Sequence, residues 1–95
     1  MANRWGIPKE TEVIVINRDL NCVYCGTSFV IVKRTWEHII NDIKINDPEN
    51  IALCCSSCNA SKGNKNLTEW LKSKYCETKG ISKDSVAKIV QNHLK

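Results

Sequence analysis

The alternation of apolar and polar residues predicts several short elements along the chain. Residues 8–19 (PKETEVIVINRD) join an apolar run to a stretch that carries Pro8, Glu10 and Glu12. Proline and acidic side chains are favoured in the first turn of a helix, so we expect a helix over these residues. The β-branched run 13–16 also suits a strand, and this alternative stays open.

Two stretches in the middle of the chain favour strands. Residues 28–40 (SFVIVKRTWEHII) are rich in β-branched and aromatic side chains, and residues 51–54 form a short apolar run. The polar residues between them, 41–50 (NDIKINDPEN), include Pro48 and are typical of a loop. The pattern therefore predicts a β-hairpin.

The rest of the chain favours helices. We expect a short helix over 55–64 that ends at Gly63, a second that begins near Asn66 and ends at Gly80, and a last one from Ser82. The second has apolar residues on one face, Leu67, Trp70, Leu71 and Tyr75, and the last has Val86, Ile89, Val90 and Leu94. Ile81 and Val86 have the spacing of a hydrophobic staple.

The size of the chain limits how it is stabilised. With 95 residues it forms one domain, of the α+β class, whose apolar core alone gives modest stability. Six cysteines offer an additional staple. We find no secretory signal and no apolar run long enough to span a membrane, so we expect a cytoplasmic protein with reduced thiols. The cysteines then bind metal rather than form disulfides.

The cysteine spacing predicts one structural zinc site. Two CxxC pairs place four thiolates at a tetrahedral ion and leave no open position for catalysis, and their members are Cys22, Cys25, Cys55 and Cys58. Cys54 competes with Cys55, but neighbouring residues on a strand point to opposite faces, so we assign Cys55 to zinc and Cys54 to the core. Cys76 is also expected to be structural.

Several polar residues near these cysteines are candidates for chemistry. Glu37 and His38 come at the end of the first predicted strand, Asn50 precedes the second, and Asn59 follows the last zinc ligand. Each has an ordinary structural reading when taken singly. The zinc, however, would bring all four into one neighbourhood. His93, near the end of the chain, is given only the structural reading.

Taken together, these motifs resemble the HNH endonuclease family, which has the ββα-metal fold. The resemblance covers residues 13–65 and rests on CxxCG, then WEHII, then NIALCCSSCNASKG. It implies a single HNH domain over 1–95, with an N-terminal helix and a helical C-terminal extension over 66–95. It also implies a metal-dependent endonuclease or nickase that acts on DNA.

The resemblance assigns roles to individual residues. His38 corresponds to the general base that activates water, and Asn50 to the asparagine that steadies the hairpin loop. Glu37 and Asn59 correspond to ligands of a catalytic Mg²⁺ or Mn²⁺, with Glu37 where the family more often has Asp and Asn59 where it often has His. Because Glu37 and His38 are adjacent on a strand, we expect them to face opposite sides.

Charge adds a mild indication of an anionic partner. The formal net charge is +4, and we nominate four basic residues near the expected site as phosphate contacts: Lys33, Arg34, Lys62 and Lys65. Lys62 lies about one turn beyond Asn59 and is expected on the same face, toward DNA.

The alternative function is a zinc-bound nucleic-acid-binding module without catalysis, and a thiol redox protein is disfavoured because two CxxC pairs suit zinc better. One active site per chain implies nicking, or cutting of both strands by a homodimer. The sequence does not indicate a target site.

Overall fold

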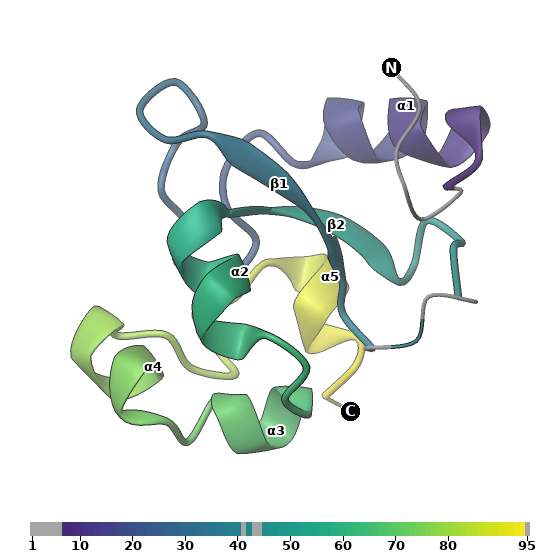
Figure 1. Cartoon of the computed structure of the whole chain (residues 1–95). Coiled ribbons are helices and arrows are strands. Elements are labelled where there is room, and N and C mark those ends of the chain that lie inside the picture. Colours follow the sequence, from purple (N-terminus) through teal and green to yellow (C-terminus); the bar gives the residue numbers. More distant parts are fainter. Residues whose placement is uncertain (1–6, 41, 43–44, 95) are drawn as a thin grey trace.

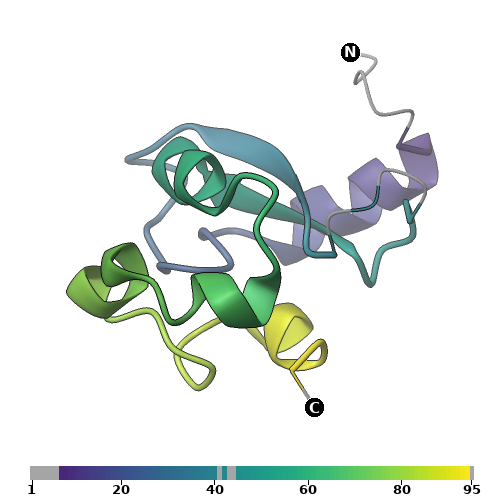
Figure 2. The same cartoon turned by 60° about the horizontal axis from the view of Figure 1, so that its bottom comes forward.

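The computed structural model describes residues 7–40, 42 and 45–94, and it has the predicted α+β architecture. Its elements follow the order α1 (Lys9–Arg18), β1 (Arg34–His38), β2 (Ile51–Cys55), α2 (Ser56–Lys62), α3 (Leu67–Trp70), α4 (Lys74–Lys79) and α5 (Lys88–Gln91). Helices α1 and α4 lie at opposite ends of the molecule (Figures 1 and 2). No described helix is long and apolar enough to cross a membrane.

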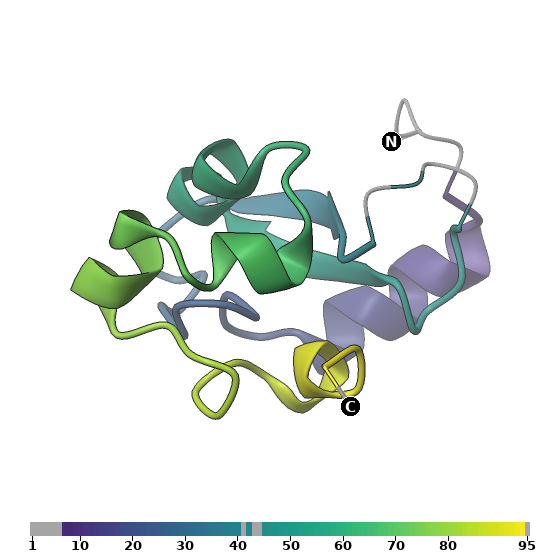
Figure 3. The same cartoon turned by 90° about the horizontal axis from the view of Figure 1, so that it is seen from below.

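The two strands form an antiparallel hairpin with separate roles for its two faces. In its register Glu37 lies opposite Ala52 and His38 lies opposite Ile51. Figure 3 shows α2 above this hairpin and α1 below it. Because side chains alternate along a strand, Glu37 belongs to the face that packs against α2, whereas His38 belongs to the other face.

Each face of the hairpin has its own apolar cluster. On the α1 face, Ile7 and Val15 pack with Ile51 and Leu53. On the α2 face a larger cluster joins the strands to the C-terminal helices, and its buried members include Tyr24, Ile39, Ala52, Cys54, Leu67, Trp70, Cys76, Ile81, Val86 and Val90. The C-terminal helices therefore complete the core, as their apolar stripes predict.

Helix α1 confirms the helical reading of residues 8–19. Its first turn follows Pro8 and contains Glu10 and Glu12. At its end the Arg18 guanidinium donates to the carbonyls of Pro48 and Ile51, and the Asp19 carboxylate accepts from the amide of Leu53. These contacts fix the base of the hairpin against α1.

The first strand is shorter than predicted, because residues 28–33 form a turn instead. Ser28 accepts through its carbonyl from the amides of Ile31 and Val32 and through its hydroxyl from Val30. Val30 and Ile31 are left 96% and 79% exposed. The closure of this turn onto the first CxxC, with a bridge between Asn21 and Ser28, overrides the β propensity.

The C-terminal helices are also shorter than predicted. The expected helix over 66–80 is divided, because Ser73 caps α4 by accepting from the amide of Cys76. Asn66 caps α3 and Gly80 ends α4 with a φ of 72°, both as predicted. Helix α5 begins at Lys88, since a turn at Ser82 precedes it.

Candidate functional site

The four predicted zinc ligands meet at one point. The Sγ atoms of Cys22, Cys25, Cys55 and Cys58 lie within 4.8 Å of one another. The Cys25 and Cys55 Sγ atoms are 3.7 Å apart. Zinc–sulfur bonds of about 2.3 Å give a tetrahedral edge of about 3.8 Å, so this cluster fits a Cys₄ zinc site.

Backbone geometry prepares both halves of this cluster. In the first pair the amide of Cys25 donates to the Cys22 Sγ, and in the second the amide of Cys58 donates to the Cys55 Sγ. Gly26 closes the first turn with a φ of 80°, which favours glycine there. Cys55 is also the N-cap of α2, so a metal bound by this cluster would fix where this helix starts.

The thiols of the cluster are electrostatically unequal before a metal binds. A hydrogen bond with Cys58 lowers the pKa of Cys22 to about 4, and the same contact raises the pKa of Cys58. Tyr75 donates its hydroxyl to the Cys58 sulfur at 3.3 Å. The thiolate, which the lowered pKa favours at Cys22, is the form that binds zinc.

The other two cysteines lie in the core, as predicted. Cys54 is fully buried beside the Thr35 hydroxyl, and desolvation raises its pKa above that of an ordinary thiol. Burial likewise raises the pKa of Cys76. The cluster of four thiols contains Cys55 and not Cys54.

Glu37 lies inside the protein, between the first CxxC and α2. Its Oε2 accepts from the Tyr24 hydroxyl at 2.6 Å and lies 3.0 Å from the Lys62 Nζ. Burial, and then the charge of Glu37, raises the pKa of Tyr24 well above its ordinary value, so this phenol stays a donor. One carboxylate thus joins three segments of the chain.

Lys62 corrects a prediction from the sequence. It does lie on the same face of α2 as Asn59, but its exposed fraction is 0%, because that face packs against β1. Its Nζ also donates to the carbonyls of Ile39 at 3.1 Å and His38 at 3.5 Å. The expectation that Lys62 contacts DNA is therefore wrong for this structure.

Asn59 is a second link between α2 and β1. Its Nδ2 donates to the Thr35 hydroxyl at 3.1 Å and to the Trp36 carbonyl at 3.4 Å. Lys62, one helical turn later, is joined to the next part of the same strand. Asn59 and Lys62 together hold α2 along β1.

Asn50 closes the loop between the strands. Its Oδ1 accepts from the Ile40 amide at 2.7 Å, and its Nδ2 donates to the carbonyls of Ile40 and Ile45. A side chain bonded to both ends of the loop holds the backbone that follows His38, which matches the predicted contacts with the hairpin loop.

His38 ends β1 on the face opposite Glu37, as the strand alternation predicts. It is 7% exposed, and its Nε2 lies 2.8 Å from the Asn46 Oδ1. Because an amide oxygen accepts, this contact favours the His38 tautomer with the proton on Nε2. Sequence reasoning missed Asn46, and it also missed Tyr24, since neither residue has a local signal for its partner.

The donor set does not fit a divalent cation at Glu37. Carboxylate and amide oxygens have the right chemistry for Mg²⁺ or Mn²⁺. In this structure, however, an ammonium and a phenol already occupy the Oε2 of Glu37. The predicted pairing of Glu37 and Asn59 around a catalytic ion therefore does not match the arrangement of these side chains.

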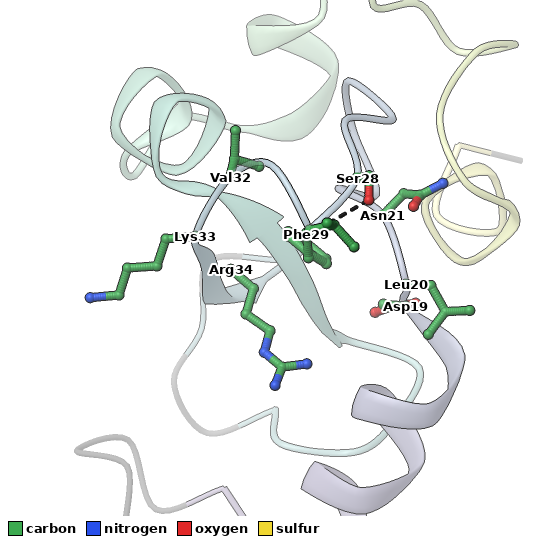
Figure 4. Close-up of a pocket in the computed structure, with 9 residues that line it drawn as sticks. Asp19, Leu20, Asn21, Ser28, Phe29, Val32, Lys33 and Arg34 are labelled. Atoms are coloured by element: carbon green, nitrogen blue, oxygen red, sulfur yellow. Dashed lines mark hydrogen bonds between the residues drawn. The ribbon is translucent and has the colours of Figure 1, made fainter.

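The other three basic residues nominated as phosphate contacts are exposed, and they lie in two separate places. Lys33 and Arg34 are at the opposite end of β1 from His38 and border a hollow of about 620 Å³ (Figure 4). Lys65 borders a smaller hollow of about 240 Å³ together with Ile39 and Ile40, which directly follow His38. Of these three residues, Lys65 is the one next to the end of β1 that carries His38.

The Glu37–Lys62 pair should be important for folding. In a Lys62→Met variant the carboxylate loses its charge partner while still buried, which should destabilise the protein by about 3–5 kcal/mol. A Glu37→Gln/Lys62→Met double variant removes both charges and should recover much of that loss. Urea unfolding of the zinc-loaded parent, the double variant and both single variants, Lys62→Met and Glu37→Gln, gives the coupling energy.

The exposed Lys65→Met variant is the control for this cycle and should stay within about 0.5 kcal/mol of the parent. A Lys62→Met protein as stable as this control would show that the buried ion pair contributes nothing to folding.

Comparison with known proteins agrees with the site. A family model described as HNH endonuclease matches residues 22–65, which contain all four zinc-cluster cysteines and the candidate residues Glu37, His38, Asn50 and Asn59. No curated protein and no solved structure matches the chain. The chain is thus similar to HNH endonucleases over residues 22–65, and the four-cysteine cluster in this segment is consistent with a zinc-bound domain of that kind.

Proposed function

We propose that the chain hydrolyses phosphodiester bonds in DNA as an HNH-type endonuclease or nickase, with His38 as general base. The observation that carries this proposal is the position of His38 within the matched domain. Its ring is oriented by the Asn46 amide at the end of β1, and Asn50 fixes the backbone that follows. A base needs this kind of fixed orientation toward the water that it activates.

The reaction places definite demands on this chain. The imidazole of His38 would take a proton from water, whose oxygen then attacks phosphorus as the bond to the leaving oxygen breaks, and the leaving oxygen takes a proton from solvent. Lys65, close to the same end of β1, would contact the DNA backbone, and Lys33 and Arg34 would contact phosphates further away. Lys65 lies near one end of β1, and Lys33 and Arg34 lie at the other end. In this proposal the DNA backbone therefore runs along β1.

The family resemblance also implies Mg²⁺ or Mn²⁺ at Glu37 and Asn59. We derive no catalytic step from such an ion, because the contacts of Glu37 do not fit that role. The zinc cluster is structural in this proposal, since four cysteines fill a tetrahedral coordination shell.

A plasmid assay tests the proposal. Supercoiled DNA incubated with zinc-loaded protein and Mg²⁺ or Mn²⁺ should give nicked circles first, because each chain has one candidate active site. Early linear product would indicate the alternative in which a homodimer cuts both strands. Tight DNA binding with no cleavage in Mg²⁺, Mn²⁺ or a metal-free EDTA sample would contradict catalysis.

A second candidate is a zinc-bound nucleic-acid-binding module without catalysis. The internal contacts of Glu37, Asn59 and Lys62 favour it, because residues that hold the fold together need no catalytic role to explain them. The same plasmid assay distinguishes the two functions, as only the nuclease changes the topology of the DNA.

A further inference from the structure

We infer that the cation which balances Glu37 is the ammonium of Lys62, so that Glu37 does not ligate a divalent cation. This inference rests on the proposed function in one respect: the proposed nuclease would use Mg²⁺ or Mn²⁺ near these residues, so these are the ions considered. The contacts between the two side chains stand independently of any activity.

The surroundings of the Lys62 Nζ match the needs of an ammonium. An ammonium has three N–H donors. Here three oxygens accept from it: the Glu37 Oε2 at 3.0 Å, the Ile39 carbonyl at 3.1 Å and the His38 carbonyl at 3.5 Å. Lys62 is thus fully partnered by oxygen atoms of β1 and its continuation.

The Glu37 carboxylate is held in the same cluster through one of its two oxygens. Its Oε2 receives the Tyr24 hydroxyl as well as the Lys62 ammonium, and both charged side chains are almost completely buried. A Mg²⁺ ion binds carboxylate oxygen at about 2.0–2.1 Å, so an ion on either oxygen of Glu37 would lie close to the Lys62 ammonium, and the two cations would repel each other across one carboxylate. Because Lys62 already neutralises this carboxylate, the ion gains little attraction there unless Lys62 is displaced.

Displacement of Lys62 is opposed by its place in the fold. The residue ends α2, where Gly63 turns the chain with a φ of 51°, and it lies one turn after the zinc-cluster residue Cys58. Moving its side chain from Glu37 would leave a charge unpaired in the interior, which is strongly unfavourable. The closed pair is therefore the stable state of this site.

This arrangement gives Lys62 a positioning role. By donating to the His38 and Ile39 carbonyls it holds the end of β1 from the α2 face, while His38 projects from the opposite face. A divalent ion in the protein–DNA complex would have to take its ligands from the substrate phosphate, water and groups other than Glu37.

Binding of Mn²⁺ tests the inference without a cleavage readout. Free Mn²⁺ can be followed by electron paramagnetic resonance during titration of zinc-loaded His38→Ala protein, with and without a short DNA duplex that this variant should leave intact. Adding Glu37→Gln to this background should change the apparent Kd by less than about twofold in both samples. The exposed Glu69→Gln variant is the control for loss of one negative charge.

A loss of about tenfold or more in Mn²⁺ affinity with Glu37→Gln, but not with Glu69→Gln, would overturn the inference. If Glu37→Gln does not fold, the Glu37→Gln/Lys62→Met pair replaces it, because that variant leaves no unpaired charge. The same two outcomes then decide the question. Nicking by the parent protein is a separate result, so a failed inference leaves the proposed function intact and the reverse also holds.

Discussion

Removal of zinc should unfold this protein. The apparent binding free energy of a structural zinc in small domains is about 10–16 kcal/mol near neutral pH, whereas a folded domain has about 5–15 kcal/mol of stability in total. Here the metal would join the turn at Cys22 and Cys25 to the start of α2. A strong chelator should therefore abolish the cooperative thermal transition measured by circular dichroism, and added zinc should restore it.

Single substitutions give this prediction a matched control. Cys58→Ser removes one ligand and should lower both the bound zinc and the melting temperature. Cys76→Ala alters an equally buried cysteine outside the cluster, so it should retain one zinc per chain. If the chelated protein still unfolds cooperatively at the melting temperature of the parent, the fold does not require a metal at the four cysteines.

The features predicted correctly from the sequence are those set by local chemistry. The CxxC spacing identifies the metal ligands because two residues between thiols let both reach one ion from a tight turn. Asn66 and Gly80 mark helix ends because capping depends on the nearest backbone groups. Asn50 was also placed correctly, at the closure of the loop between the strands.

The features that the sequence did not predict depend on contacts between segments that are far apart in the chain. Residues 28–33 have strand propensity, but a contact with residues before the first CxxC turns them away from the sheet. The bond from Tyr24 to Glu37 joins residues 13 positions apart, and no local pattern indicates it. Long-range contacts of this kind decide the chemistry of the site.

The burial of Lys62 could have been predicted from the sequence. Residues four apart on a helix share a face, and Lys62 follows Cys58 by four residues. Because Cys58 must point inward to bind zinc, Lys62 is directed into the protein as well, and both are fully buried. Its helical face was predicted correctly, but the surface that faces it is β1 rather than DNA.

The replacement His38→Ala should lower the rate of plasmid nicking by about 10²–10⁴-fold, the usual contribution of a general base. The imidazole is the group that removes the proton from water in the proposed reaction, and alanine offers no acceptor. The zinc content and the melting temperature should change little in comparison, because the hairpin is held by Asn50, Asn59 and Lys62. Rates under single-turnover conditions separate this chemical effect from DNA binding.

His93→Ala is the matched histidine control. His93 borders the same hollow as Lys65, but its ring contacts the Glu49 carbonyl and not the Asn46 amide that orients His38, so its loss should alter the nicking rate by less than about threefold. If His38→Ala nicks DNA as fast as His93→Ala does, His38 is not the base. If His38→Ala loses activity but retains its DNA affinity and zinc, the chemistry belongs to His38, and the internal Glu37–Lys62 pair then serves to hold that residue in place.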